Sequence, residues 1–297
     1  MAERIVFGEE STFEIRNLRP ADLPEALQMV TAAGWNQTEE DWKRILGLSP
    51  EGCFGAFAGA RLVGTITTMT YGREAAWIGM MLVKEEYRRR GIGKRLMQAS
   101  LEFCAARGID TIKLDATPAG LPLYESFGFI PEADIQRWEG TSRPTRKAET
   151  GGAALSRSFE ESLFELDRRA FGADRRAFLK LLIADACCEP VVLSDLSPIS
   201  KAPAGYALAR RGARALYAGP IVAVDPRAAG ILLDGLLTRM PEGKVYLDLA
   251  GNSGVGGDVL EDRGFTRQRD LTRMFRGRPR KVGTSSMIFA IAGPEAG

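Results

Sequence analysis

Apolar residues follow two different periods along the first half of the chain. Residues 75–83 form an unbroken apolar run between a short polar turn and a cluster of charges, which is typical of a buried strand. Residues 92–107 instead place apolar side chains about every 3.6 positions and end at Gly108, which predicts an amphipathic helix. The sequence therefore predicts a strand, a short charged loop and a helix in direct succession.

Strands and helices are expected to alternate through the rest of this half. The expected strands are 13–18, 53–58, 62–71, 75–83, 111–117 and 129–135. The expected helices are 22–33, 38–48, 92–107 and 120–127, and a capping box at Thr38 and Asp41 opens the second of them. Strands that alternate with helices in this way predict a mixed α/β sheet.

The second half of the chain repeats this plan. Its expected helices are 158–169, 175–186, 226–240 and 258–263, and its expected strands are 191–193, 205–210, 215–224 and 245–249. Between the halves, residues 141–152 are polar and contain Pro and Gly, as interdomain linkers do. We therefore expect two tandem lobes, 1–140 and 153–297, each a mixed sheet flanked by helices, with the second a duplicate of the first.

Length and charge narrow the class of protein. At 297 residues the chain is long enough for two domains, each with its own core. Its 40 basic and 38 acidic residues nearly balance, so nothing favours nucleic acid as a partner. No apolar run approaches the roughly 18 residues of a membrane span, and the first residues lack the layout of a signal peptide. We expect a cytoplasmic protein without a membrane partner.

The chain contains no histidine. Ser-His-Asp and Cys-His catalysis, histidine zinc sites and imidazole proton transfer are therefore excluded. The cysteines at 53, 104, 187 and 188 have neither metal-ligand nor disulfide spacing, so no metal is expected. An enzyme of this composition must use Tyr, Asp, Glu, Lys, Cys or backbone groups, and direct acyl transfer from a thioester is one reaction that can.

The loop after the strand at 75–83 reads Arg88-Arg89-Arg90-Gly91-Ile92-Gly93-Lys94. Glycines at the start of a helix leave the first backbone N–H groups uncovered, where they have no intrahelical partner and the helix dipole is positive. Such a turn can bind a phosphate. A P-loop is excluded because arginine follows Gly93-Lys94, and a dinucleotide fingerprint is excluded because leucine replaces its third glycine.

The frame Arg88-x-x-Gly91-x-Gly93 after a strand resembles the pyrophosphate loop of the GNAT acyl-CoA N-acyltransferases. A second segment, 117–129, resembles that family's other signature, a helix that carries a tyrosine before Gly-Phe. Either segment alone is weak evidence, but the two stand in the right order about thirty residues apart. The resemblance extends from about residue 13 to residue 140.

The resemblance implies acetyl-CoA as co-substrate and gives roles to individual residues. The backbone of the glycine loop would hold the pyrophosphate, and the end of the preceding strand would pair with the pantetheine arm like an added strand. The implied cofactor-binding residues are Met81, Leu82, Val83, Arg88, Arg89, Arg90, Gly91, Ile92, Gly93 and Lys94. Without the resemblance, the three arginines would be interpreted as a solvated basic turn.

Tyr124 falls where the family places a hydroxyl near the cofactor sulfur. A phenol, with a pKa near 10, can donate a proton to the departing thiolate or hydrogen-bond it. The alternative is a helix tyrosine that only packs its ring in the core. The second lobe keeps neither signature, because Leu232 replaces the last glycine and no tyrosine precedes Gly264-Phe265. We expect that lobe to lack the pyrophosphate loop.

No carboxylate lies within the strand 75–83 to accept the proton of an attacking amine. Asp115 is a candidate base. Apolar and polar side chains alternate along residues 111–117, so the Asp115 side chain lies either in the acceptor cleft or on the outer face of the sheet. Glu74, just before the strand, is a candidate substrate contact. The resemblance implies that the loop with Trp35 and Asn36 borders the acceptor pocket, where Trp35 either stacks on the substrate or is simply buried.

These features together favour an N-acetyltransferase that moves an acetyl group from acetyl-CoA to an amine by direct attack. The acceptor is expected to be a small-molecule or peptide amine, and monomer and homodimer are both compatible with the sequence. The alternative is a non-catalytic acyl-CoA sensor or a partner-binding module, which the missing carboxylate on the central strand favours.

Overall fold

The computed structural model describes residues 13–144, 157–194, 203–278 and 283–297. From residue 145 onward the expected linker lies outside the described residues, and its first two residues are the end of a strand. Each helix and strand expected from the sequence has a counterpart in the described ranges. None of the helices in these ranges is both long and apolar enough to cross a membrane.

The first half alternates strands and helices in the expected order. Its strands are β1 (Glu14–Asn17), β2 (Cys53–Ala58), β3 (Arg61–Tyr71), β4 (Ala75–Val83), β5 (Thr111–Ala116) and β6 (Ile130–Ser142). Its helices are α1 (Leu23–Ala32), α2 (Glu39–Leu48), α3 (Ile92–Ala106) and α4 (Leu121–Ser126). The capping box of α2 is confirmed: Asp41 N donates to Thr38 Oγ1 at 3.3 Å, and Thr38 N donates to the Asp41 carboxylate at 2.8 Å.

The second half has a similar set of elements. Its helices are α5 (Arg157–Phe171), α6 (Arg176–Ala184), α7 (Pro226–Arg239) and α8 (Asp258–Glu261). Its strands are β7 (Val191–Ser194), β8 (Pro203–Arg210), β9 (Leu216–Ala223), β10 (Gly243–Ala250), β11 (Thr266–Gly277) and β12 (Ile288–Ala290). The Asp225 carboxylate caps α7 by accepting from Ala228 N at 2.8 Å. The start of α7 is therefore covered by a carboxylate of the chain itself. The glycine loop precedes the corresponding helix of the first half, α3.

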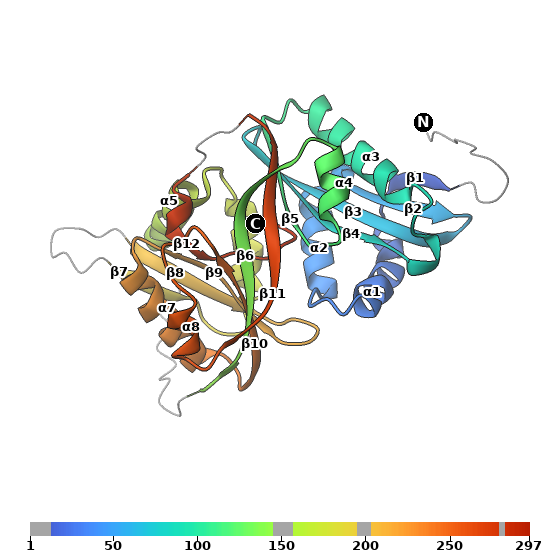
Figure 1. Cartoon of the computed structure of the whole chain (residues 1–297). Helices are drawn as coiled ribbons and strands as arrows, with labels where there is room; N and C mark the ends of the chain where they lie inside the picture. Colours follow the sequence, from blue (N-terminus) through green and yellow to red (C-terminus); the bar gives the residue numbers. More distant parts are fainter. Residues whose placement is uncertain (1–12, 145–156, 195–202, 279–282) are drawn as a thin grey trace.

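The described strands of both halves form one twelve-stranded sheet, in the order β1-β2-β3-β4-β5-β11-β6-β10-β12-β9-β8-β7. The halves are joined because each lends a long strand to the other: β11 pairs with β5, and β6 pairs with β10. These two strands also pair with each other and run side by side at the centre of the molecule (Figure 1). The sequence analysis expected no strand at 266–277, so it did not anticipate this exchange.

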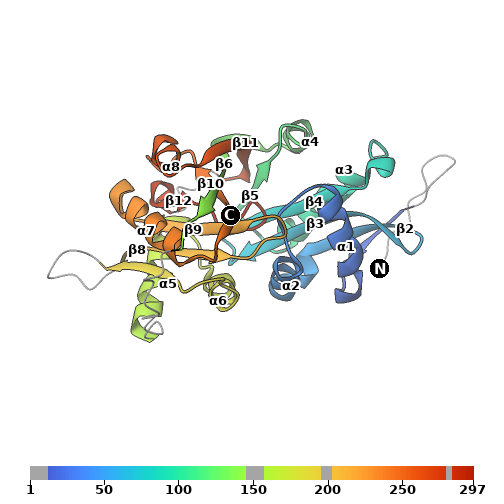
Figure 2. The ribbon, with the colours of Figure 1, turned by 90° about the horizontal axis from the view of Figure 1, so that it is seen from below.

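Helices cover both faces of the sheet. Figure 2 shows α3 and α4 on one face of the first half and α1 and α2 on the other. On the side of α1 and α2, one buried apolar cluster extends from Leu23 in the first half to Leu182 and Ile291 in the second. On the opposite side each half has its own core, around Leu96 of α3 and around Leu232 of α7. The shared cluster holds the two halves together through apolar burial.

In each half, two parallel strands pair only at one end. In the described structure β4 pairs with β5 over Ala75–Ile78 and no further, which leaves the edge of β4 from Gly79 onward without a neighbouring strand. β9 pairs with β10 only at Leu216 and Tyr217, but there β12 fills the gap and pairs with both strands. The seam between the parallel strands is therefore open in the first half and filled by residues 288–290 in the second.

Candidate active site

The glycine loop ends in a helix start that is open to an outside ligand. Gly91 is the N-cap of α3 with φ of 80°, a left-handed conformation that favours glycine, and a Cβ added there would meet no atom within 4 Å. Arg95 is the first residue whose amide donates within the helix, to Gly91 O at 3.1 Å. The amides of residues 92–94 therefore lack intrahelical acceptors and lie at the positive end of the helix dipole.

Basic side chains surround this helix start. Arg88, Arg89 and Lys94 are exposed, and Arg88 is oriented by its Nε, which donates to Val83 O at 3.1 Å. Arg89 has φ of 61°, which is uncommon for a residue with a side chain. The loop thus combines bare amides and positive charge in one place, which suits a diphosphate.

A groove runs from this loop along the open edge of β4. Every residue that the sequence analysis assigns to the cofactor lines this groove, except Arg90, and Tyr124 lines it as well. The far wall is formed by the segment from Thr117 to Tyr124. The structure therefore brings the two sequence signatures, the glycine loop and the tyrosine helix, to one continuous surface.

A β-bulge turns the end of β4 where it leaves β5. The register of β3 against β4 slips between Thr65 and Thr67, so that Met80 and Met81 together oppose a single residue. Met80 has φ of 47°, a strained conformation for methionine, and the Thr65 hydroxyl fixes it by donating to Met80 O at 2.7 Å. The bulge sets the course of the unpaired β4 edge along the groove.

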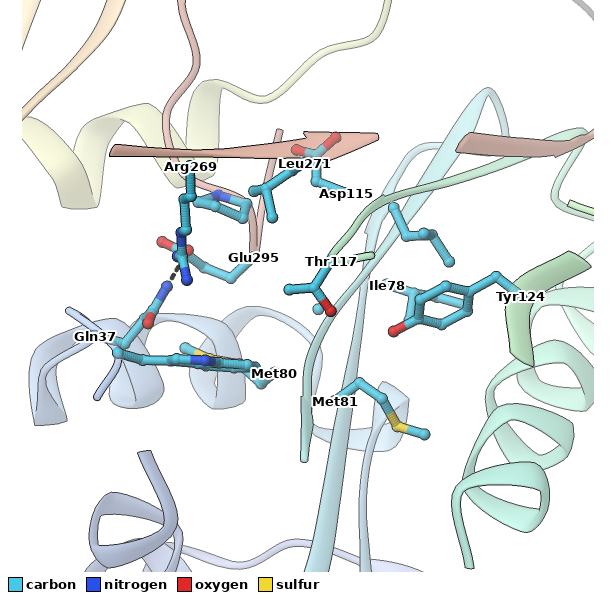
Figure 3. A pocket seen from close by; sticks show the side chains of 14 residues that line it. Gln37, Ile78, Met80, Met81, Asp115, Thr117, Tyr124, Arg269, Leu271 and Glu295 are labelled. Carbon is cyan, nitrogen blue, oxygen red and sulfur yellow. Dashed lines mark hydrogen bonds between the residues drawn. The ribbon is translucent and has the colours of Figure 1, made fainter. Parts of the chain in front are cut away.

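Tyr124 projects from α4 with its ring buried and its hydroxyl directed toward the groove (Figure 3). The ring packs edge-on against Phe129 with centroids 6.3 Å apart, and it needs Gly120 beside it, since a Cβ there would lie 2.8 Å from the ring. Burial raises the pKa of Tyr124 to about 12. The hydroxyl therefore stays protonated at neutral pH and can donate a proton or a hydrogen bond.

A second pocket adjoins the groove. The two cavities share the lining residues Trp35, Met81, Thr117 and Tyr124. The second half of the chain contributes Arg269 and Leu271 from β11 and Pro294 and Glu295 from the segment after β12 (Figure 3). The exchange of strands therefore places residues of the second half beside the end of the first half's groove.

Glu295 is a buried carboxylate in this pocket, with 4% of its surface exposed. Its Oε2 accepts from Gln37 Nε2 at 2.7 Å, and its Oε1 accepts from an Arg210 guanidinium nitrogen at 2.8 Å. Burial, together with the nearby charge of Asp41, raises the pKa of Glu295, although Arg210 and Gln37 oppose the shift. A carboxylate with a raised pKa beside a groove is suited to accept a proton.

The segment that carries Glu295 is anchored on the first half. Two side chains donate to its backbone oxygens, the Tyr71 hydroxyl at 2.7 Å and Trp77 Nε1 at 3.0 Å. Gly79 of β4 allows the close approach, because a Cβ there would lie 2.6 Å from Glu295 Cα. The position of the carboxylate is therefore determined by backbone contacts as well as by its own hydrogen bonds.

Asp115 lines the same pocket from β5. Both of its oxygens accept from the Arg273 guanidinium, at 2.8 and 2.9 Å, and its side chain is 0% exposed. The guanidinium also lies over the Trp77 ring, 4.5 Å from its centroid. Burial raises the pKa of Asp115, although Arg273 opposes the shift. The ion pair joins β5 to the exchanged strand β11.

Two residues expected to contact the substrate are not in the pocket lining. Asn36 faces the second half, where its Nδ2 donates to Ala215 O at 3.1 Å and its Oδ1 accepts from the amides of Arg214 and Ala215 at 2.9 and 3.0 Å. Glu74 lies on an exposed turn before β4, at the end where β4 is paired with β5. Trp35, the third residue expected to contact the substrate, lines both cavities.

Three polar residues of the pocket escaped the sequence analysis: Gln37, Arg269 and Glu295. Gln37 directly follows the loop residues that were singled out, so its position in that loop was a usable signal. Arg269 and Glu295 belong to the other half of the chain, and no local motif marks them. Among the residues that the structure describes, no cluster of acidic and cysteine side chains is arranged to hold a metal.

Comparison with known proteins identifies both halves. The model of the Acetyltransferase (GNAT) family matches residues 14–129, and that of an Acetyltransferase (GNAT) domain matches residues 163–290. YitH of Bacillus subtilis, an uncharacterised N-acetyltransferase, is 26% identical over 88% of this chain and 91% of its own length. The holothin acyltransferase of a Pseudoalteromonas species is 24% identical over 94% of each chain.

A solved structure extends the similarity to the whole molecule. A Pyrococcus horikoshii protein assigned as an acetyltransferase has a TM-score of 0.80 and 25% identity, covering 99% of this chain and 98% of its own. These matches confirm the resemblance seen in the glycine loop and the tyrosine helix. The chain therefore belongs to the GNAT acetyltransferase family and is an acyltransferase with two such domains in tandem.

Proposed function

We propose that this protein transfers the acetyl group of acetyl-CoA to an amine, with the first half binding the coenzyme and the second half completing the acceptor pocket. The observation that carries the proposal is the wall shared by the groove and the pocket, where Met81, Thr117 and Tyr124 line both. A thioester at the end of the groove would face an amine in the pocket. Proximity of this kind is what direct transfer requires.

The groove fits the coenzyme along its length. The bare amides of residues 92–94 and the neighbouring arginines match a diphosphate. The unpaired edge of β4, which includes Met81 and Val83, offers backbone groups to the amides of a pantetheine arm, as in the addition of a strand to a sheet. Glycine at position 93 leaves room for the Met81 side chain beside the loop, because a Cβ there would lie 3.2 Å from Met81 Cε.

When bound, acetyl-CoA supplies an activated thioester whose acyl carbon can bond to the amine nitrogen while its bond to sulfur breaks. Tyr124, protonated because its pKa is about 12, donates a proton to the sulfur as it leaves. Glu295 accepts the proton that the amine nitrogen loses, directly or through a water molecule. One proton is thus given and one is taken by side chains of the same pocket.

Asp115 is the other carboxylate that could accept this proton. Both of its oxygens are held by one guanidinium and its side chain is fully covered, whereas Glu295 shares one oxygen with the neutral amide of Gln37. Glu295 is therefore the better placed base, and Asp115 serves to hold β11 against β5. The absence of a carboxylate on β4, which favoured a non-catalytic sensor, is compensated from the second half.

The coenzyme site is tested by titrating acetyl-CoA calorimetrically into three proteins: wild type, Gly93→Glu and Gly230→Glu. Gly230 lies in α7, the counterpart of α3, where a Cβ would meet only the Arg263 side chain at 3.4 Å. We expect Gly93→Glu to lose at least about tenfold in affinity because a carboxylate would stand beside the diphosphate. Gly230→Glu should bind like wild type. Equal affinities of all three proteins would refute the assignment of the loop.

A further inference from the structure

We propose that the acceptor is a free α-amino acid with an apolar side chain, whose carboxylate binds Arg269 and whose amino group is held by Gln37 and Glu295. This inference rests on the acetyl transfer proposed above and specifies its substrate. It follows from two buried polar atoms of the acceptor pocket, Arg269 Nε and Gln37 Oε1, that have no hydrogen-bond partner within the described part of the protein.

Arg269 is the first of these groups. It extends from β11 into the pocket beside Glu295 and Gln37 (Figure 3). Its Nε is buried and has no hydrogen-bond partner. The guanidinium takes part in no ion pair among the described residues. The residue as a whole is half-buried, and a buried donor atom without a partner is costly, so its retention in a cavity points to a ligand that completes it.

The carboxylates near Arg269 are already engaged by other arginines. Arg137, directly opposite Arg269 in the register of β6 and β11, binds both oxygens of Asp248 at 2.7 and 2.6 Å. Asp115 is bound by Arg273, and Glu295 by Arg210. Burial and the nearby charge of Arg137 lower the pKa of Arg269 below its usual value, although the charge of Asp248 opposes the shift. An anion from outside would complete the site, and a carboxylate matches the planar fork of a guanidinium.

Gln37 is the second group. Its Nε2 donates to the Glu295 carboxylate, which can only accept, so the orientation of the amide is fixed. The other end of that amide, Oε1, is buried and has no hydrogen-bond partner, and the whole residue is 8% exposed. The pocket therefore offers an acceptor at Gln37 and a carboxylate at Glu295 close to the donor at Arg269.

An α-amino acid carries both required groups on one carbon atom. Its amino group can donate to Gln37 Oε1 and Glu295 while its carboxylate accepts from Arg269. Much of the remaining lining is apolar and includes Ile78, Met80, Leu114 and Leu271, so an aliphatic or aromatic side chain fits better than a charged one. A peptide N-terminus lacks the adjacent carboxylate and would leave Arg269 unpaired.

The test compares matched acceptors by release of CoA thiol from acetyl-CoA. For leucine and phenylalanine, the free amino acid is compared with its amide and with the amine that lacks the carboxyl carbon. We expect the free amino acid to have the highest kcat/KM, and Arg269→Gln to lower it by about 10- to 100-fold while leaving the amide and the simple amine nearly unchanged. Arg269→Lys should restore part of the preference, since it keeps the charge and loses the fork.

Arg267→Gln is the matched control, because Arg267 lies on the same strand but is exposed and pairs with Asp270. It should behave like wild type with every acceptor. The inference is overturned if the amide or the simple amine reacts as well as the amino acid, if the preference survives in Arg269→Gln, or if no amino acid reacts. Reaction of the simple amines alone would leave the proposed acetyl transfer intact, and the acetyl-CoA titration with Gly93→Glu tests the coenzyme site separately.

Discussion

Replacing Glu295 by glutamine removes one buried charge from the acceptor pocket and keeps the shape of the side chain. The pKa of Glu295 is raised by burial and by the nearby charge of Asp41, and Arg210 and Gln37 only partly offset this shift. A group whose pKa is higher in the folded state contributes stability that is lost as the pH rises through that pKa, so at neutral pH the ionised Glu295 destabilises the fold. Glutamine removes this cost.

The substitution also has an opposing effect on stability. The bond from Arg210 at 2.8 Å loses its charged acceptor, and hydrogen bonds of that kind contribute about 1.5–3 kcal/mol. Arg210 keeps a second carboxylate, because its Nε donates to Asp41 at 2.9 Å. The two effects oppose each other, so the change in Tm should stay within about 5 °C.

The rate should change far more than the stability. Loss of a general base typically lowers the rate by about 10²- to 10⁴-fold. In wild type, kcat/KM should fall toward low pH with an apparent pKa above that of an ordinary glutamate, and this limb should be missing in Glu295→Gln. Protonation of the amine, with a pKa near 10 for a simple alkylamine, adds a second limb that both proteins share.

Asp115→Asn is the matched comparison for this experiment. Burial raises the pKa of Asp115 as well, so its ionised form also carries a desolvation cost. Arg273, unlike Arg210, has no second carboxylate among the described residues, so the loss of its buried bidentate partner should outweigh that gain and lower Tm, while the low-pH limb should remain. The reasoning about Glu295 is refuted if Glu295→Gln stays within about threefold of the wild-type rate, or if the limb disappears only in Asp115→Asn.

Two further substitutions test neighbouring parts of the site. Tyr124→Phe keeps the ring contact with Phe129 and removes only the hydroxyl. We expect kcat to fall about 10²-fold while the affinity for acetyl-CoA, measured by calorimetry, is unchanged. An unchanged kcat would show that this tyrosine has a purely structural role. Gly79→Ala places a methyl group 2.6 Å from Glu295 Cα and should cost about 1–3 kcal/mol in urea unfolding and lower kcat as well. Gly47→Ala is the control, because Gly47 lies on α2 with open space around it, and it should lower neither the free energy of unfolding nor kcat. Equal behaviour of the two variants would contradict the proposed contact.

The parts of the groove proposed for the coenzyme could be predicted from sequence because they are local. The loop at 88–94 and Tyr124 each depend on a short run of residues whose glycines and apolar spacing are visible in the chain. The strand before the loop is equally plain, since it is apolar throughout. Trp35 was proposed from the resemblance to the family, which implies a place at the pocket for the loop between the first two helices, and it lines both cavities.

The pocket proposed for the acceptor could be predicted only in part, because one of its walls is formed by the exchanged strand β11 of the second half. β11 contains four arginines in twelve residues, which hides the alternation of a strand, and no strand was expected there. The partner of Asp115 was equally invisible, since the choice between cleft and outer face depends on which strand lies beside β5. Glu295 follows a segment with no motif, and long-range contacts bring it to the site: the close approach at Gly79 and the hydrogen bonds from Tyr71 and Trp77 to its neighbours.

The crossing of β6 and β11 has a consequence for the origin and engineering of this molecule. By sequence each strand belongs to one half, and by hydrogen bonding each also belongs to the other. A fragment ending at Ser142 would leave the outer edge of β5 bare and would lack one side of its acceptor pocket. The second half therefore cannot be removed without changing the first, because β11 and the segment with Glu295 form part of the first half's sheet and pocket.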